Sequence, residues 1–221
     1  MLLVLLLLGV APLLVLGADD AVPPSTTPAT NPIPMPEPLE RRSVTLVYDF
    51  EGKEPAPEVV AALKSELEEN WRQSRVDFDW RPYLAIRQGD TFPDLVVVHF
   101  RGNCQAAPGF SLVANPRQPA MTGGFSDEAL AYSPVVDGVV QPFSSVLCDR
   151  VHTLVTPDMN GRSTAPPEPA PLYGRALGRV LSHELYHILN QTRQHDRTGL
   201  AKSRLSATQL LAPKFDFASV H

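Results

Sequence analysis

The sequence predicts an α+β domain, and two kinds of pattern lead to that prediction. Short stretches of alternating or β-branched residues, typical of strands, recur between residues 43 and 147. Two longer segments, 58–75 and 172–189, repeat apolar residues at helical spacing. The order strand, helix, several strands, helix predicts a mixed β-sheet with a backing helix, a long second helix and a short C-terminal helix.

The N-terminal part of the chain has the composition of an export signal. Residues 2–17 are almost wholly apolar, but Gly9 and Pro12 interrupt them, and the run is short for a membrane span of about 20 residues. Small residues follow at Gly17 and Ala18, so residues 1–18 are predicted to be a signal peptide. The protein is then secreted or periplasmic. An uncleaved anchor is the alternative, and only that alternative makes the membrane a partner.

A proline-rich segment follows, at residues 19–42. Its many prolines, interleaved with Ser, Thr and Ala, cannot form a buried core, so we expect a disordered linker or a pro-segment. The remaining residues, 43–221, suit one domain with a sizeable core. The net charge is -5 and no long basic run occurs, which argues against nucleic acid as a partner.

The predicted elements follow in order along residues 43–147. Strands are expected at 43–50, 77–83 and 94–101, the last of them an interior strand because it is nearly continuous in apolar residues. A helix is expected at 58–75. Residues 129–136 and 139–147 should form a hairpin around Asp137-Gly138, a favoured two-residue turn.

Residues 156–171 are polar, rich in proline and without periodicity. Loops of this length in a compact domain are usually functional or disordered. We therefore expect either a flap over a cleft or a floppy connection.

Cys104 and Cys148 are the two cysteines of the chain. In an exported protein one disulfide between them is the simplest interpretation, and two buried free thiols are the alternative.

The segment from residue 172 to residue 189 carries the sequence His183-Glu184-Leu185-Tyr186-His187, which has the form H-E-x-x-H. Residues four apart share one face of a helix, so the two imidazoles can bind one metal ion. Glu184 then lies beside the metal, where it can take a proton from metal-bound water. The alternative is an ordinary buried helix.

A helical wheel places these residues on the inward side of the helix. Most apolar residues of 172–189 lie on one broad arc, with His183, Glu184 and His187 within it or at its edge. Gly178 lies on the same side, where it would allow close packing. The wheel places four residues on the opposite, polar side, namely Arg175, Arg179, Ser182 and Tyr186.

A zinc site of this kind needs a third protein ligand. His195 is the first candidate, with Asp196 and Asp216 as alternatives. A continuous helix would place His195 about 12 Å beyond His187, so the chain must turn between them. Asn190 is suited to end the helix because Asn tolerates the left-handed conformation. After this turn, Ser206 and Gln209 form a capping-box pattern that predicts a short terminal helix, packed under the metal loop.

The motif resembles that of the zincin metallopeptidases, specifically the metzincins, whose pattern is H-E-x-x-H-x-x-G-x-x-H. His183, Glu184 and His187 match it, whereas Asn190 stands at the glycine position and Arg193 at the third histidine position. A histidine follows two residues later, and no methionine follows Met159, so the methionine turn of the family is missing. The resemblance implies a peptide or protein substrate, bound antiparallel to an exposed sheet edge.

The function expected from these residues is that of an exported zinc metallopeptidase with one Zn²⁺ per chain. His183, His187 and His195 would hold the metal, and Glu184 would be the general base in peptide hydrolysis. The alternatives are a non-catalytic binding or structural domain with a structural metal, and hydrolysis of a non-peptide amide.

Other chemically suggestive residues receive structural interpretations. His99 and His152 are expected in the core, and Tyr173 in core packing. The glutamates Glu66, Glu68 and Glu69 are expected on a solvated helix face.

Overall fold

The computed structural model describes residues 41–105, 129–160 and 169–218. The chain divides into two units, Met1–Leu39 and Glu40–His221, and the described residues belong to the second. The predicted signal peptide and nearly all of the predicted linker lie outside the described residues. So do residues 161–168, which are half of the predicted loop.

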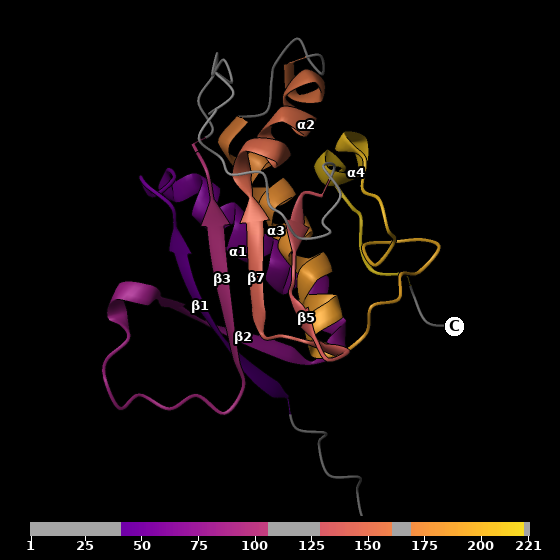
Figure 1. Cartoon of the computed structure of the whole chain (residues 1–221). Coiled ribbons are helices and arrows are strands. Elements are labelled where there is room, and N and C mark those ends of the chain that lie inside the picture. The colour runs from indigo at the N-terminus through magenta and orange to yellow at the C-terminus, as the bar shows by residue number, and fades with distance from the viewer. Residues whose placement is uncertain (1–40, 106–128, 161–168, 219–221) are drawn as a thin grey trace, which may run out of the picture. The chain divides into compact units, whose positions relative to one another are not determined.

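A five-stranded sheet forms the centre of the domain, in the order β2-β1-β3-β7-β4 (Figure 1). Its strands are β1 (Arg42–Phe50), β2 (Val76–Pro82), β3 (Leu95–Arg101), β4 (Ala131–Tyr132) and β7 (Phe143–Leu147). β4 pairs antiparallel with β7, and the other neighbours run parallel. The sheet is therefore mixed, the fold is α+β as predicted, and β3 is the interior strand expected from its apolar run.

The predicted hairpin is present but divided. β5 (Val135–Val136) and β6 (Val139–Val140) pair across Asp137-Gly138, whose φ angles of 51° and 81° match the turn expected from that dipeptide. The flanking residues separate from this two-stranded ribbon, and β4 and β7 join the main sheet instead. This separation leaves Ser133 and Pro134 as a bend between β4 and β5.

Two long helices, α1 (Pro57–Trp71) and α3 (Pro169–Leu189), pack against each other behind the sheet (Figure 1). Gly174 and Gly178 of α3 lie at their contact. A Cβ at Gly174 would lie 2.3 Å from the carbonyl oxygen of Val59, and one at Gly178 would lie 2.7 Å from that of Leu63. The two glycines thus allow the helix backbones to approach closely, as expected for Gly178.

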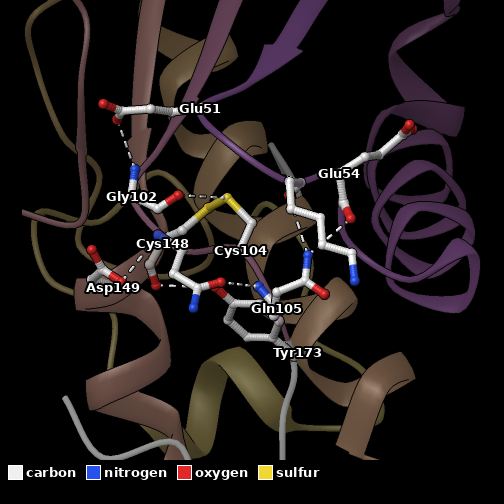
Figure 2. The surroundings of a disulfide bond; sticks show 10 residues. Glu51, Glu54, Gly102, Cys104, Gln105, Cys148, Asp149 and Tyr173 are labelled. Carbon is white, nitrogen blue, oxygen red and sulfur yellow. Dashed lines mark hydrogen bonds between the residues drawn. A yellow bond between two sulfur atoms is a disulfide. The ribbon is translucent and has the colours of Figure 1, made fainter.

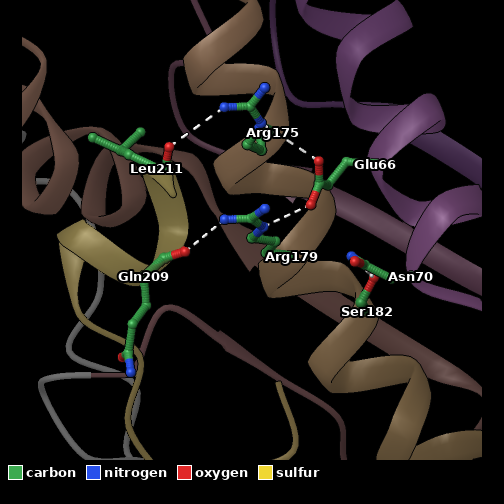
Figure 3. Close-up of polar contacts among 7 residues, drawn as sticks. All are labelled: Glu66, Asn70, Arg175, Arg179, Ser182, Gln209 and Leu211. Atoms are coloured by element: carbon green, nitrogen blue, oxygen red, sulfur yellow. Dashed lines mark hydrogen bonds and ion pairs between the residues drawn. The ribbon is translucent and has the colours of Figure 1, made fainter. Parts of the chain in front are cut away.

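The prediction that one side of α3 is polar and faces solvent is wrong. Arg179 is 1% exposed and Ser182 is fully buried, because α1 and α4 (Ala207–Leu211) cover that side of the helix. Figure 3 shows the resulting contacts: Arg179 donates to Glu66 on α1 at 2.6 Å and to the carbonyl of Gln209 on α4 at 2.6 Å. Glu66 is correspondingly 14% exposed in its side chain, not solvated as predicted.

A further helix, α2 (Cys148–Asn160), was not predicted, and it occupies part of the segment expected to be a loop. Val151 and Val155, four residues apart, are buried on its inner face. Pro157 lies in the last turn of α2 and, having no N–H, cannot donate a helical hydrogen bond there. His152 is buried against Tyr173, with ring centroids 5.5 Å apart, as the core interpretation of both residues predicted.

A disulfide joins Cys104, after β3, to Cys148, the first residue of α2 (Figure 2). Tyr173 of α3 donates its hydroxyl to the carbonyl of Cys148 at 3.0 Å, and Asn103 donates its N–H to Asp149 at 3.1 Å. These contacts fix the end of the sheet against the start of both helices.

The C-terminal part of the chain forms the predicted short helix, α4. Both hydrogen bonds of the capping box are present between Ser206 and Gln209. Among the described residues, no helix is long and apolar enough to cross a membrane.

Candidate metal centre

Helix α3 presents His183 and His187 on one face. Their ring centroids are 4.7 Å apart and their Nε2 atoms 3.1 Å apart, as expected for positions one helical turn apart. Both residues lie in the last two turns of the helix, where the chain must next reverse.

The reversal takes place at Gln191, not at Asn190 as predicted. Gln191 has a φ of 48°, and the N–H of Thr192 then donates to the carbonyl of His187 at 3.1 Å. The Gln191 side chain donates to the carbonyl of Val140 on β6 at 3.0 Å. This anchor explains how a residue other than Asn or Gly holds the left-handed conformation.

The turn brings His195 back to the other two histidines. Its Nε2 lies 3.2 Å from that of His187, and its ring stacks on that of His183 at 5.2 Å between centroids. Of the described residues, these three alone form a group whose ligand atoms lie within 4.8 Å of one another. Asp196 and Asp216, the alternatives from the sequence, are not part of that group.

Backbone carbonyls fix the orientation of two of the rings. His183 Nδ1 lies 2.7 Å from the carbonyl oxygen of Leu200, and His187 Nδ1 lies 2.8 Å from that of Thr192. A carbonyl oxygen can only accept, so each Nδ1 carries the proton and each Nε2 keeps its lone pair. Such hydrogen bonds orient the histidines of metal sites.

The converging Nε2 atoms fit a cation. The Nε2 lone pairs of His183 and His187 face one another at 3.1 Å and repel, unless a positive charge lies between them. Tetrahedral zinc with Zn–N bonds of about 2.0–2.1 Å places its nitrogen ligands about 3.3 Å apart, close to the observed spacing. Burial is the main cause that lowers the pKa of His183 to about 4, so its imidazole is neutral at pH 7, as a ligand must be.

Glu184 is buried beside the histidines and is 7% exposed. Burial raises the pKa of its carboxyl to about 7, although the hydrogen bond from Ser133 acts in the opposite direction. The Ser133 hydroxyl donates to Oε2 at 2.7 Å. Ser133 belongs to no recognisable motif, and only the bend after β4 brings it to α3.

These residues line a cavity of about 670 Å³, within the size range of small-ligand sites. His183, Glu184, His187 and His195 form one part of its wall. The rest is formed by residues 129–131, the last of which begins β4, by residues of α2 and by the segment before α4.

Neither Tyr186 nor His99 is among the described residues that line the cavity. The Tyr186 ring lies 5.4 Å from that of His187 and 6.0 Å from that of Phe217. The core position expected for His99 is wrong. His99 is not a core residue, since its side chain is 45% exposed and its Nδ1 lies 2.5 Å from Asp49. The outward-facing side of β3 explains that exposure, because Val96, Val98 and Phe100 take the inward positions.

Comparisons with known proteins give one likeness. No family model and no curated protein matches the sequence. Among solved structures, archaemetzincin from Methanopyrus kandleri matches with 15% identity and a TM-score of 0.40, covering 80% of this chain and 89% of that one. The function of this chain must therefore be inferred from its own site residues.

Proposed function

We propose that this protein is an exported zinc metallopeptidase that hydrolyses peptide bonds, with Glu184 as general base. The observation that carries the proposal is the convergence of three imidazole Nε2 atoms beside a buried carboxyl group in one cavity. Three protein ligands, without a fourth, are the donor set of catalytic rather than structural zinc sites.

His183, His187 and His195 would hold the metal through Nε2. A zinc ion in such a site supplies Lewis acidity, which lowers the pKa of water to about 7 and polarises a carbonyl group. The carbonyls of Leu200 and Thr192 keep the two helical imidazoles in the required tautomer.

The proton transfers belong to Glu184. A carboxyl group with a pKa of about 7 can both accept and return a proton near neutral pH. Ser133 holds Oε2, and the second oxygen, Oε1, would take the proton from the attacking water. The same atom would then deliver it to the leaving nitrogen of the peptide bond.

The sheet offers a place for an extended substrate. β4 is the last strand in the order of the main sheet, and Ala131 of β4 lines the cavity. A peptide could add to this edge, antiparallel to β4, with its backbone paired to the strand. Of the sheet's two edge strands, β4 and β2, β4 alone contributes to this cavity.

Two further observations favour this proposal over a structural metal site in a binding domain. A structural zinc site needs no buried carboxylate outside its ligand set, whereas a hydrolase needs a base in that place. The Cys104–Cys148 disulfide is typical of proteins in oxidising compartments, which supports export.

Replacing Glu184 by Gln tests the proposal. The zinc-loaded full chain is compared with the E184Q variant, and hydrolysis of a mixed peptide library is followed by mass spectrometry. The variant should keep its zinc and its Tm but lose about 10²- to 10⁴-fold in turnover. Glu69→Gln, the same change at an exposed residue of α1, is the matched control and should keep wild-type turnover. Equal turnover in wild type and E184Q would contradict the proposal.

A further inference from the structure

The cavity at the histidines is basic, although the chain as a whole is acidic. Three cationic side chains line it, from Arg150, Lys202 and Arg204, and Glu184 is the one acidic residue among its described lining residues. The chain carries a net charge of -5, so this local excess of positive charge is opposite in sign to the rest of the protein. A cleft lined by one sign of charge concentrates ligands of the opposite sign.

The first of these cations is held at the wall formed by the sheet edge. Arg150 lies in the first turn of α2, two residues after the disulfide-linked Cys148. Its Nη1 atom donates to the carbonyl of Ala129, next to β4, at 2.9 Å. The guanidinium is therefore fixed beside the strand on which a peptide would lie, and its remaining N–H groups can donate to an anion.

The other two cations belong to the segment that supports the metal ligands. Lys202 directly follows Leu200 and Ala201, which are both buried. The carbonyl of Leu200 orients His183, and the carbonyl of Ala201 accepts from the N–H of Asp196 at 2.9 Å, next to His195. Lys202 therefore follows directly on the backbone segment whose carbonyls hold His183 and the residue after His195 in place.

Apolar side chains complete the cavity. Leu130, Leu154, Val180 and Leu205 line it together with the cations. A ligand that satisfies both features carries an apolar group and, close to it, a negative charge. For a peptide, that charge is a carboxylate.

We propose that this cavity selects peptides that carry a carboxylate beside an apolar residue near the cleaved bond, with Lys202 and Arg150 as the groups that bind the carboxylate. The inference rests on the proposed peptide hydrolysis. The carboxylate has two possible sources, an Asp or Glu side chain or the free C-terminus of the peptide, and both have the same chemistry.

A matched peptide set tests the inference. Each peptide has the same apolar core, with Glu, Gln or Lys placed in turn at each of three positions on either side of the cleaved bond. Each is prepared with a free C-terminus and with an amidated one. The zinc-loaded full chain should cleave the best carboxylate peptide with at least tenfold higher kcat/KM than its neutral counterpart.

Comparison of the free and the amidated peptides shows whether the preferred carboxylate is a side chain or the C-terminus. A gain from Glu over Gln that survives amidation identifies a side chain, whereas a gain lost on amidation identifies the C-terminus. In Lys202→Gln the advantage should fall to threefold or less, because kcat/KM falls more for the carboxylate peptide than for its neutral counterpart. Arg150→Gln should have the same effect. Lys53→Gln, an exposed lysine outside the cavity, should change neither value.

Binding gives a second readout that needs no turnover. Anisotropy of labelled peptides on the zinc-loaded E184Q protein should show the same preference for the carboxylate peptide, and added salt should weaken it. Equal kcat/KM for charged and neutral peptides, with hydrolysis abolished by E184Q, would overturn the carboxylate preference and leave the peptidase intact. No hydrolysis of any peptide by wild type would overturn the proposed function, and the binding comparison would then decide the preference by itself.

Discussion

Replacing both Cys104 and Cys148 by Ser should lower the free energy of unfolding by about 4 kcal/mol. The disulfide joins residues 44 positions apart, and closing a loop of that length removes about 13 cal/mol/K of entropy from the unfolded chain. At 25 °C this entropy corresponds to about 4 kcal/mol. The buried position of both residues adds to the loss, because serine hydroxyls replace sulfur in the core.

Urea unfolding of the double variant beside wild type measures this difference directly. Wild type treated with a reducing agent is the matched control, and it should lose a similar amount of stability without any substitution. The loop also carries Ala131, which lines the cavity, and Ser133, which donates to Glu184, so the same variant should lose turnover. A change in unfolding free energy below 1 kcal/mol would refute the reasoning, because it would mean that the cross-link constrains nothing.

Three further substitutions probe the packing and the base. In Gly178→Ala the added Cβ would lie 2.7 Å from the carbonyl oxygen of Leu63, so the free energy of unfolding in urea should fall by about 1–3 kcal/mol. An unchanged unfolding midpoint would contradict the close approach of α1 and α3. Arg179→Met should lower the free energy of unfolding by about 3 kcal/mol in the same assay. This is the low end for breaking a buried ion pair, because Arg175, 3.5 Å from Glu66, remains as a partner of that carboxylate. A loss under 0.5 kcal/mol would mean that the Arg179–Glu66 ion pair is not buried. Ser133→Ala removes a hydrogen bond to the Glu184 carboxylate, and a hydrogen bond to a charged group is worth about 1.5–3 kcal/mol. The value of kcat should therefore fall roughly 10- to 100-fold, with zinc content unchanged. An unchanged kcat would show that the Ser133 hydroxyl does not position Glu184.

The parts of the fold that the sequence predicted are those governed by local periodicity. Alternation predicted β1 and β2, and a nearly continuous apolar run predicted β3, each to within about two residues. The Asp137-Gly138 pair predicted the turn between β5 and β6. Helix α1 and the core of α3 followed from apolar spacing. The H-E-x-x-H spacing likewise placed His183, Glu184 and His187 on one face of a helix, since four residues make about one turn.

The parts that were missed depend on tertiary contacts. Helix α2 was overlooked because Pro157 and the polar residues after it obscure the spacing of Val151 and Val155. Arg179 was expected in solvent, and only the contact of α3 with both α1 and α4 explains its burial. The reversal at Gln191 depends on its side-chain bond to β6, and Ser133 reaches Glu184 across 51 residues of sequence. No local pattern encodes either contact.

Zinc content of the purified full chain tests the central claim most directly. Wild type, His195→Ala and His99→Ala are each dialysed with zinc, freed of excess metal and measured for zinc per chain. His99, a half-exposed histidine paired with Asp49, is the control for the loss of an imidazole. The proposed site predicts one zinc per chain in wild type and His99→Ala and a sharp loss in His195→Ala. Full zinc content in His195→Ala, or none in wild type, would contradict the three-histidine site.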